Sequence, residues 1–241
     1  MTVVEPDMEL QVAVAKAGKY ATRESGDTLE MIERPHGGLS FVLADGQTSG
    51  RGAKSVSNIV ARKVVSLLGE GVRDGAAARA AHDYLFTHYQ GKVQADLSIV
   101  SLDLRTKTVV LSRNTACPAL VRQDGEWRLI QDAAKPVGIY ASTKPTITEF
   151  PFQVGTYVIV STDGLWSAGR RKGETMDVLA SARDRFEKGG RPSAIADTLL
   201  REALRWDEGR PADDISVLVL GVLRRVEEGA DIRRLTMWVP I

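Results

Sequence analysis

The sequence is poor in the residues that most often carry zinc, thiol or redox chemistry. It contains one cysteine, Cys117, and three histidines in 241 residues. A single cysteine excludes an intramolecular disulfide and a cysteine-rich zinc site, and it suits a reducing compartment. We therefore expect the chemistry of this chain to be carried by oxygen-bearing side chains.

The sequence also lacks a strong excess of charge and a long apolar segment. Its formal net charge is +1, so the sequence shows no excess of positive charge that would attract nucleic acid or an anionic membrane. Residues 1–25 carry charges throughout, so neither a signal peptide nor a membrane span is expected. These absences predict a cytoplasmic protein without nucleic-acid or membrane partners.

The common nucleotide-binding loops are absent too, although the stretch FVLADGQTSGRGAKS, residues 41–55, is rich in glycine. A Walker loop needs glycine at two set positions before its lysine, and these positions hold Ala53 and Thr48. The dinucleotide fingerprint fails because its third glycine would fall at Ser55. What remains in this stretch is an Asp-Gly pair at the end of an apolar run.

Short strand-like runs dominate the chain, and amphipathic helices lie between them in pairs. Several runs are apolar on both faces, as in YVIVS and ISVLVL, which is typical of sheets that are covered on both sides. The predicted strands are 10–15, 39–44, 97–102, 108–111, 127–130, 157–161 and 215–222. The predicted helices are 56–68, 76–89, 175–187 and 192–206.

The order of these elements favours an α+β fold of antiparallel sheets with helices packed outside. Consecutive strands are joined by short turns, which a doubly wound parallel sheet does not allow. No linker rich in proline, glycine or serine divides the chain. We expect a single domain over residues 1–241, with 224–241 as a C-terminal extension.

Aspartates recur beside turns at the ends of the predicted strands. Any one of them has a purely structural explanation, because Asp-Gly is a common turn dipeptide. Together they form a set of oxygen ligands, and such ligands suit Mg²⁺ or Mn²⁺ rather than zinc. The aspartates of this set are Asp27, Asp45, Asp163, Asp213 and Asp214.

Four motifs in this order resemble the metal-dependent PPM, or type-2C, Ser/Thr protein phosphatases, and most of all their short bacterial branch of sporulation and stress-response phosphatases. The motifs are SGD (25–27), ADGQTSG (44–50), STDG (161–164) and DDIS (213–216). The resemblance spans about residues 10–223. It implies a four-layer αββα sandwich, with two antiparallel sheets flanked by paired helices.

The resemblance also implies a role for each residue of the site. Asp45 would bridge two Mn²⁺ or Mg²⁺ ions, the Gly46 carbonyl and Asp27 would bind one of them, and Asp163 and Asp213 would bind the other. Asp214 replaces a common asparagine and would support the ligands without binding metal. Arg23 would bind the substrate phosphate, although a solvated surface arginine explains it equally well. Gln47 stands where many relatives have a histidine, and glutamine cannot act as a general acid.

The function implied is hydrolysis of phosphoserine or phosphothreonine in bacterial signalling by a water that the two metals activate. The substrate would be a phosphorylated protein, such as a regulator of a stress response or of a sigma factor. Two alternatives stay open: a pseudophosphatase that binds a partner without turnover, and a hydrolase of small phosphoesters. Because a metal-activated water needs no thiolate, we expect Cys117 to have a packing role.

Overall fold

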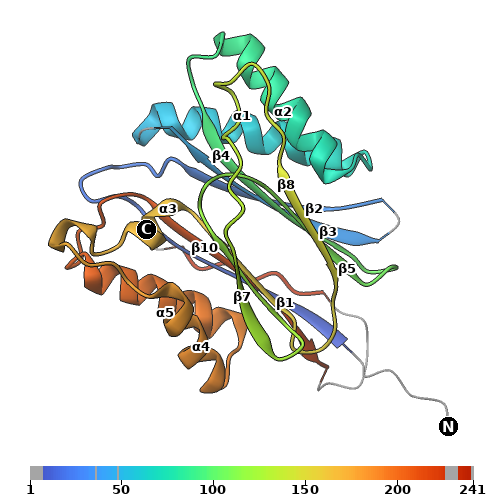
Figure 1. Cartoon of the computed structure of the whole chain (residues 1–241), viewed down its shortest axis with the longest axis vertical. Helices are drawn as coiled ribbons and strands as arrows, with labels where there is room; N and C mark the ends of the chain where they lie inside the picture. Colours follow the sequence, from blue (N-terminus) through green and yellow to red (C-terminus); the bar gives the residue numbers. More distant parts are fainter. Residues whose placement is uncertain (1–7, 36, 48, 226–232, 240–241) are drawn as a thin grey trace.

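The computed structural model describes residues 8–35, 37–47, 49–225 and 233–239. Two antiparallel sheets of five strands each face one another, and helices cover both outer faces (Figure 1). This arrangement confirms the predicted α+β sandwich of four layers. None of the helices in the described ranges combines the length and the apolarity that crossing a bilayer requires.

The first sheet has the strand order β1-β10-β9-β6-β7, so both ends of the described β-structure meet in it. Its strands are β1 (Met8–Ala17), β10 (Ile215–Arg224), β9 (Tyr157–Ser161), β6 (Ala119–Gln123) and β7 (Glu126–Ile130). The second sheet has the order β2-β3-β4-β5-β8. Its strands are β2 (Asp27–Glu33), β3 (Gly38–Gly46), β4 (Ala95–Asp103), β5 (Thr108–Asn114) and β8 (Thr146–Pro151).

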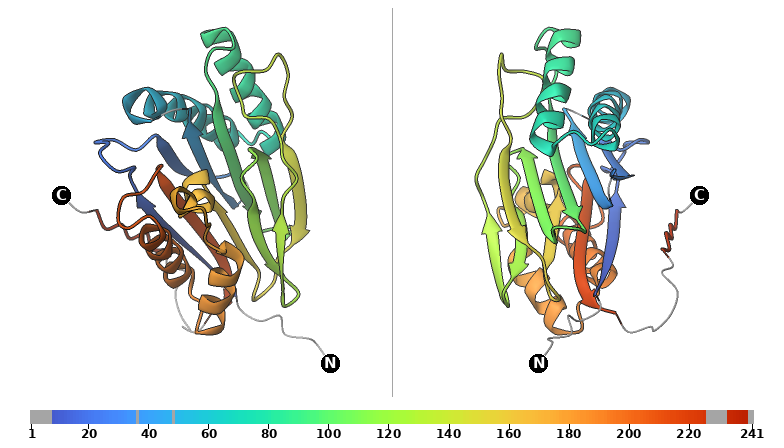
Figure 2. Two further views of the ribbon diagram at one scale, coloured as in Figure 1. Left: turned by 60° about the vertical axis from the view of Figure 1, so that its left-hand side comes forward. Right: turned by 90° about the vertical axis from the view of Figure 1, so that its right-hand side faces the viewer.

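Each sheet has its own pair of helices on the outside. The pair α1 (Gly50–Gly69) and α2 (Asp74–Tyr89) lies on the second sheet, and α4 (Val178–Glu187) and α5 (Pro192–Trp206) lie on the first (Figures 1 and 2). A short helix, α3 (Asp163–Ser167), and the 3₁₀ turn η1 (Arg170–Lys172) follow β9. The outer helix pairs explain why strands such as β9 and β10 are apolar on both faces.

Three apolar cores separate the four layers, and alternation along β3 shows how one strand serves two of them. Phe41 and Leu43 belong to the core between the two sheets, whereas Val42 and Ala44 belong to the core under α1 and α2. Successive side chains of a strand point to opposite faces. Asp45 therefore continues the row that faces the other sheet, at the rim of the inner core.

The element boundaries differ from the predicted ones where turns and helices meet. α1 begins at Gly50, because the glycine-rich stretch after β3 becomes the first helical turns instead of a longer loop. α4 begins at Val178, where Asp177 caps the helix by accepting a hydrogen bond from the backbone N–H of Ala180 at 2.9 Å. The prediction gave no bounds for β2, β6 and β8, which are short or carry charged residues.

The proposed C-terminal extension starts where β10 ends, at Arg224. Within it the structure describes residues 224, 225 and 233–239, and the others lie outside the described residues. Arg233 forms an ion pair with Glu33 of β2 at 3.0 Å. The division into one domain and an extension stays a prediction.

Candidate metal centre

Two aspartates, from the first and second motifs, meet at one rim of the sandwich. Asp27 at the start of β2 and Asp45 near the end of β3 are direct cross-strand partners. Direct partners in an antiparallel pair project from the same face of the sheet. Their carboxylates thus stand side by side and face the first sheet.

Asp27 is fully buried, and hydroxyl groups from the opposite sheet bind only one of its two carboxylate oxygens. Oδ2 accepts hydrogen bonds from Thr162 Oγ1 at 3.0 Å and from Ser216 Oγ at 2.6 Å. Oδ1 is buried without a hydrogen-bond partner among the described residues. Burial raises the pKa of Asp27, and the hydrogen bonds from Ser216 and Thr162 oppose that rise.

Asp45 lies at the centre of the acidic group. Burial raises its pKa to about 9, and the charges of neighbouring aspartates add to the effect. In order of their influence on the pKa, these neighbours are Asp27, Asp163, Asp96 and Asp213. Four carboxylates drawn from both sheets therefore lie close enough to destabilise the charge on Asp45.

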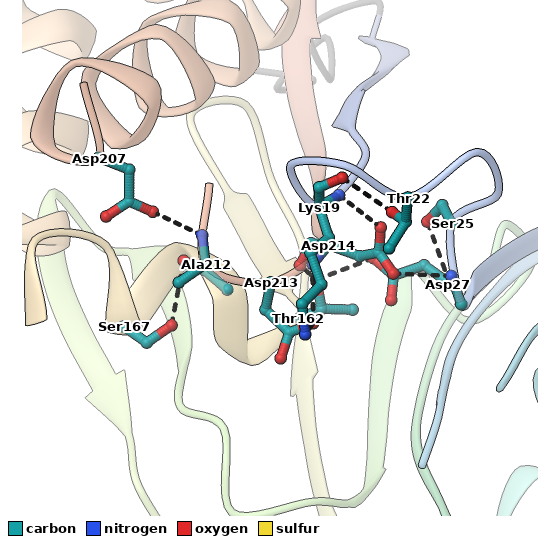
Figure 3. Close-up of polar contacts among 12 residues, drawn as sticks. Lys19, Thr22, Ser25, Asp27, Thr162, Ser167, Asp207, Ala212, Asp213 and Asp214 are labelled. Atoms are coloured by element: carbon teal, nitrogen blue, oxygen red, sulfur yellow. Dashed lines mark hydrogen bonds and ion pairs between the residues drawn. The ribbon is translucent and has the colours of Figure 1, made fainter. Parts of the chain in front are cut away.

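Asp163 and Asp213 reach this rim from the side of the first sheet, and Figure 3 shows Asp213 next to Asp214. Asp163 is the first residue of α3, and Asp213 lies in the loop just before β10. Partial burial raises the pKa of Asp163, and the charge of Asp213 raises it further. The backbone at Gly164 passes so near that an added Cβ would lie 2.2 Å from the Asp214 carbonyl oxygen. Glycine at this position lets the two acidic segments approach one another.

Gly46 allows a second close approach, this time between β3 and α1. A Cβ at this position would lie 2.0 Å from the carbonyl oxygen of Ala53. The close packing of this strand end against the first turns of α1 therefore requires a residue without a side chain here. The Asp-Gly pair is explained by packing at Gly46 as well as by the chemistry of Asp45.

Asp214 anchors the loop that precedes Asp27. Its carboxylate accepts hydrogen bonds from the backbone N–H of Lys19 at 2.8 Å and of Gly26 at 2.7 Å (Figure 3). Both oxygens of Asp214 are thus engaged by main-chain donors. These bonds are consistent with a supporting role, and that role stays a proposal.

Three lysines make polar contacts with residues of the acidic group. Lys16 and Lys54 both donate to the main-chain carbonyl of Asp27, at 3.1 and 2.7 Å. Lys19 pairs with Asp213 at 3.8 Å. Arg23 lies exposed in the loop between β1 and β2, so its contact with a substrate phosphate stays a prediction.

Sequence reasoning missed Asp96, which is the cross-strand partner of Asp45 on β4. Its only signal was an acidic residue at the start of the apolar run DLSIV, and many strands begin in this way. Burial raises the pKa of Asp96 to about 6. Together with Asp45 it lines a small cavity of about 10 Å³, which has room for about one water or ion.

Cys117 also lines this cavity, together with Asp45 and Asp96. The thiol is buried and donates to the Ser161 carbonyl at 3.2 Å. Burial raises the pKa of Cys117, and the nearby charge of Asp163 raises it further. Both effects disfavour the thiolate, which is the nucleophilic form.

The donor set matches a hard divalent cation. It consists of carboxylate oxygens, and one of them, Oδ1 of Asp27, is buried without a partner among the described residues. Burial and, after it, the charges of neighbouring aspartates raise the pKa of Asp27, Asp45 and Asp163. As the side chains stand in the described ranges, no group of three or more His, Cys, Asp or Glu residues is arranged to hold a metal ion. The residues fit the cation by their chemistry, and the ligand set remains a proposal.

Comparison with known protein families shows which family this chain belongs to. The family model for stage II sporulation protein E (SpoIIE) matches residues 35–223, which include Asp45, Asp163 and Asp213. The chain belongs to the SpoIIE family. It is 22% identical to stage II sporulation protein E of Bacillus subtilis over 223 residues, and 22% identical to that of Priestia megaterium over 210 residues. These alignments cover 92% and 87% of this chain but only 27% and 36% of the relatives.

Solved structures of PP2C phosphatases share the fold of this SpoIIE-family chain. The PP2C domain of Bacillus subtilis SpoIIE, solved with a fragment of its regulatory domain, has a TM-score of 0.76 at 21% identity over 90% of this chain and 64% of that one. The phosphatase PstP with two manganese ions has a TM-score of 0.68 at 16% identity, over 90% and 99%. RsbX with magnesium also has a TM-score of 0.68, at 15% identity over 90% and 99%.

Proposed function

We propose that this SpoIIE-family chain is a metal-dependent phosphoprotein phosphatase that hydrolyses phosphoserine or phosphothreonine in bacterial signalling. The observation that carries the proposal is the state of Asp27, which is fully buried beside Asp45 with one carboxylate oxygen unpartnered. Leaving a charged oxygen buried without a partner is costly unless a cation compensates it. The PP2C fold and the metals named for PstP and RsbX support the same conclusion.

The chain would hold two Mn²⁺ or Mg²⁺ ions through five residues. They are Asp27, Asp45, the Gly46 carbonyl, Asp163 and Asp213. When bound, such a pair of ions lowers the pKa of a shared water toward neutrality and offsets the negative charge of phosphoryl oxygens.

The protein's own groups would position the reactants. Thr162 and Ser216 fix Asp27 from the opposite sheet, and Asp214 ties down the loop that leads into it. The ammonium group of Lys19 lies beside Asp213 and is partly exposed, so an incoming phosphate can reach it. Gln47 cannot donate a proton as an acid, and the leaving serine or threonine would take its proton from solvent.

A phosphorylated protein is the substrate class that we propose, such as a regulator of a stress response or of a sigma factor. The names of the similar proteins support it, because they concern sporulation and the bacterial stressosome. The chain spans about a quarter to a third of its curated relatives. Partner choice by the whole protein is therefore part of the proposal.

Turnover of phosphoserine and phosphothreonine peptides should be compared with turnover of an aryl phosphate, each with Mn²⁺ and with a chelator. Mn²⁺-dependent cleavage of the phosphopeptides is the expected result. Mn²⁺ binding without turnover of any substrate would indicate a pseudophosphatase. Cleavage of the aryl phosphate alone would indicate a hydrolase of small phosphoesters, and failure to bind Mn²⁺ would contradict the metal centre itself.

A further inference from the structure

Three aspartates form one row across the second sheet. β2 pairs with β3 so that Asp27 opposes Asp45, and β3 pairs with β4 so that Asp45 opposes Asp96. Directly opposed residues share a face of the sheet. All three carboxylates consequently project toward the first sheet at the same rim, and Asp45 stands in the middle.

Thr115 holds the carboxylate of Asp96 in a defined position. The Thr115 hydroxyl oxygen accepts a hydrogen bond from the backbone N–H of Cys117 at 2.9 Å, and the hydroxyl donates to Asp96 Oδ2 at 2.5 Å. A hydroxyl has one proton to donate, so this proton is committed to Asp96. Thr115 engages the Oδ2 atom of Asp96.

Asp96 lies at one end of this row, next to Asp45. It lines the same small cavity as Asp45, together with Thr115, Cys117 and Thr162. Asp163, from the side of the first sheet, is near enough to interact electrostatically with Asp96. The buried Asp27 Oδ1 at the other end of the row is a second, independent sign that this rim receives a cation.

A purely structural role explains Asp96 poorly. Anchoring Thr115 needs one acceptor oxygen, which a neutral asparagine would supply as well. An aspartate directly opposite Asp45 instead adds repulsion between like charges on adjacent strands. The negative charge at this position is therefore unfavourable unless a cation sits between the carboxylates.

We propose that Asp96 is a further carboxylate of the metal centre, positioned by Thr115, and that it faces a divalent cation on the side of Asp45 nearest Asp163. The assignment rests on the proposed metal-dependent phosphatase function. It adds a ligand-bearing strand, β4, to the segments that the motifs identify.

The test measures Mn²⁺ affinity by titration calorimetry and thermal unfolding with and without Mn²⁺, so it does not depend on turnover. Asp96→Asn should weaken Mn²⁺ binding by at least about 10–100-fold, because losing even an outer-shell partner of a metal ligand has an effect of this size. Its unfolding temperature in chelator should be no lower than that of the wild type. Thr115→Val should weaken Mn²⁺ binding in the same direction but less, because the carboxylate remains and only its orientation is lost.

Asp197→Asn is the matched control, since it makes the same change of charge at an exposed position of α5. It should bind Mn²⁺ like the wild type. If Asp96→Asn also binds like the wild type and unfolds earlier in chelator, Asp96 is only a structural anchor and the assignment is wrong. Asp45→Asn in the same titration separates the two proposals: if it lowers Mn²⁺ affinity and Asp96→Asn does not, only the assignment of Asp96 fails. If the wild type binds no Mn²⁺, both fail.

Discussion

Asp27 and Asp45 face each other directly across the β2–β3 ladder, and Asp27 is fully buried. Two carboxylates in this position repel each other, and the repulsion raises the pKa of Asp45 beyond the effect of burial alone. A fold keeps such a pair at a cost in stability. Because of this cost, neutralising one member of the pair should raise the stability of the metal-free protein and at the same time impair its function.

Asp45→Asn should abolish function while leaving the fold intact. Asparagine has nearly the same shape but replaces an anion shared by two cations with a neutral amide. Mn²⁺-dependent turnover should fall by orders of magnitude. The free energy of unfolding in chelator should hold or rise, because one of two opposed carboxylates is neutral. Turnover and denaturant unfolding check the two parts, and an active Asp45→Asn protein with unchanged Mn²⁺ dependence would end the dimetal hypothesis.

The adjacent Asp213 and Asp214 should respond differently to the same substitution. Asp214 accepts backbone hydrogen bonds from both Lys19 and Gly26, and asparagine can accept only one of them with its single oxygen. Asp214→Asn should therefore lower the free energy of unfolding by about 1–3 kcal/mol. Asp213→Asn should change the unfolding by less than about 1 kcal/mol, since its partly exposed ion pair contributes little, but it should weaken Mn²⁺ binding strongly.

Unfolding in chelator and Mn²⁺ calorimetry on both variants distinguish these roles. The reverse pattern, with Mn²⁺ affinity lost mainly in Asp214→Asn, would show that Asp214 rather than Asp213 carries the ligand.

Gly46→Ala should be strongly destabilising because of a clash with α1. The added Cβ would lie 2.0 Å from the Ala53 carbonyl oxygen, and relieving such an overlap costs about 1–3 kcal/mol or more. Gly52→Ala is the matched control, because a Cβ there meets nothing within 4 Å and Gly52 lies inside α1. It should stabilise the protein by about 0.5–1 kcal/mol. Equal unfolding free energies for the two variants would contradict the close approach of β3 and α1.

Cys117→Ser should leave Mn²⁺-dependent hydrolysis largely unchanged. The thiol is buried and its pKa is raised, and serine can still donate to the Ser161 carbonyl. Steady-state kinetics in Mn²⁺ is the appropriate measurement, because an alkylating reagent would also fill the cavity beside Asp45 and Asp96. Loss of the chemical step in a folded Cys117→Ser variant would point to a cysteine-based mechanism.

The preference of the folded protein for a neutral His82 should lower its free energy of unfolding in mild acid. Its Nδ1 accepts a hydrogen bond from the backbone N–H of Gly138 at 3.0 Å, and this bond requires the neutral ring. Burial lowers the pKa of His82, and the nearby charge of Asp83 opposes that shift only in part. The unfolded chain therefore binds the proton first as the pH falls through about 6.5, and stability decreases below this pH by at most about 1.4 kcal/mol per pH unit.

His82→Gln removes this titration and should flatten the dependence of unfolding free energy on pH between about 5 and 6.5. His88→Gln, at an exposed position of the same helix, should keep the wild-type slope. Denaturant unfolding of the three proteins at several pH values is sufficient. Identical slopes for wild type and His82→Gln would show that His82 does not contribute.

The sequence by itself determined the architecture and most of the acidic set. The runs YVIVS and ISVLVL are apolar on both faces, which requires sheets covered on both sides, and the paired amphipathic segments supply the cover. Asp45 and Asp163 were visible because an Asp-Gly pair after an apolar run is a local signal. The sequence predicted that such strand ends would gather at one rim.

Only the tertiary structure decided which side chains oppose one another. Asp96 has no local signature, and it becomes part of the acidic row only because the β3–β4 register places it opposite Asp45. The sequence likewise gives no sign that Asp214 anchors the Lys19–Gly26 loop, since Asp214 and the loop are far apart along the chain. Cross-strand register and loop contacts depend on the packing of the whole sandwich, because a shift of one residue would turn every side chain to the other face.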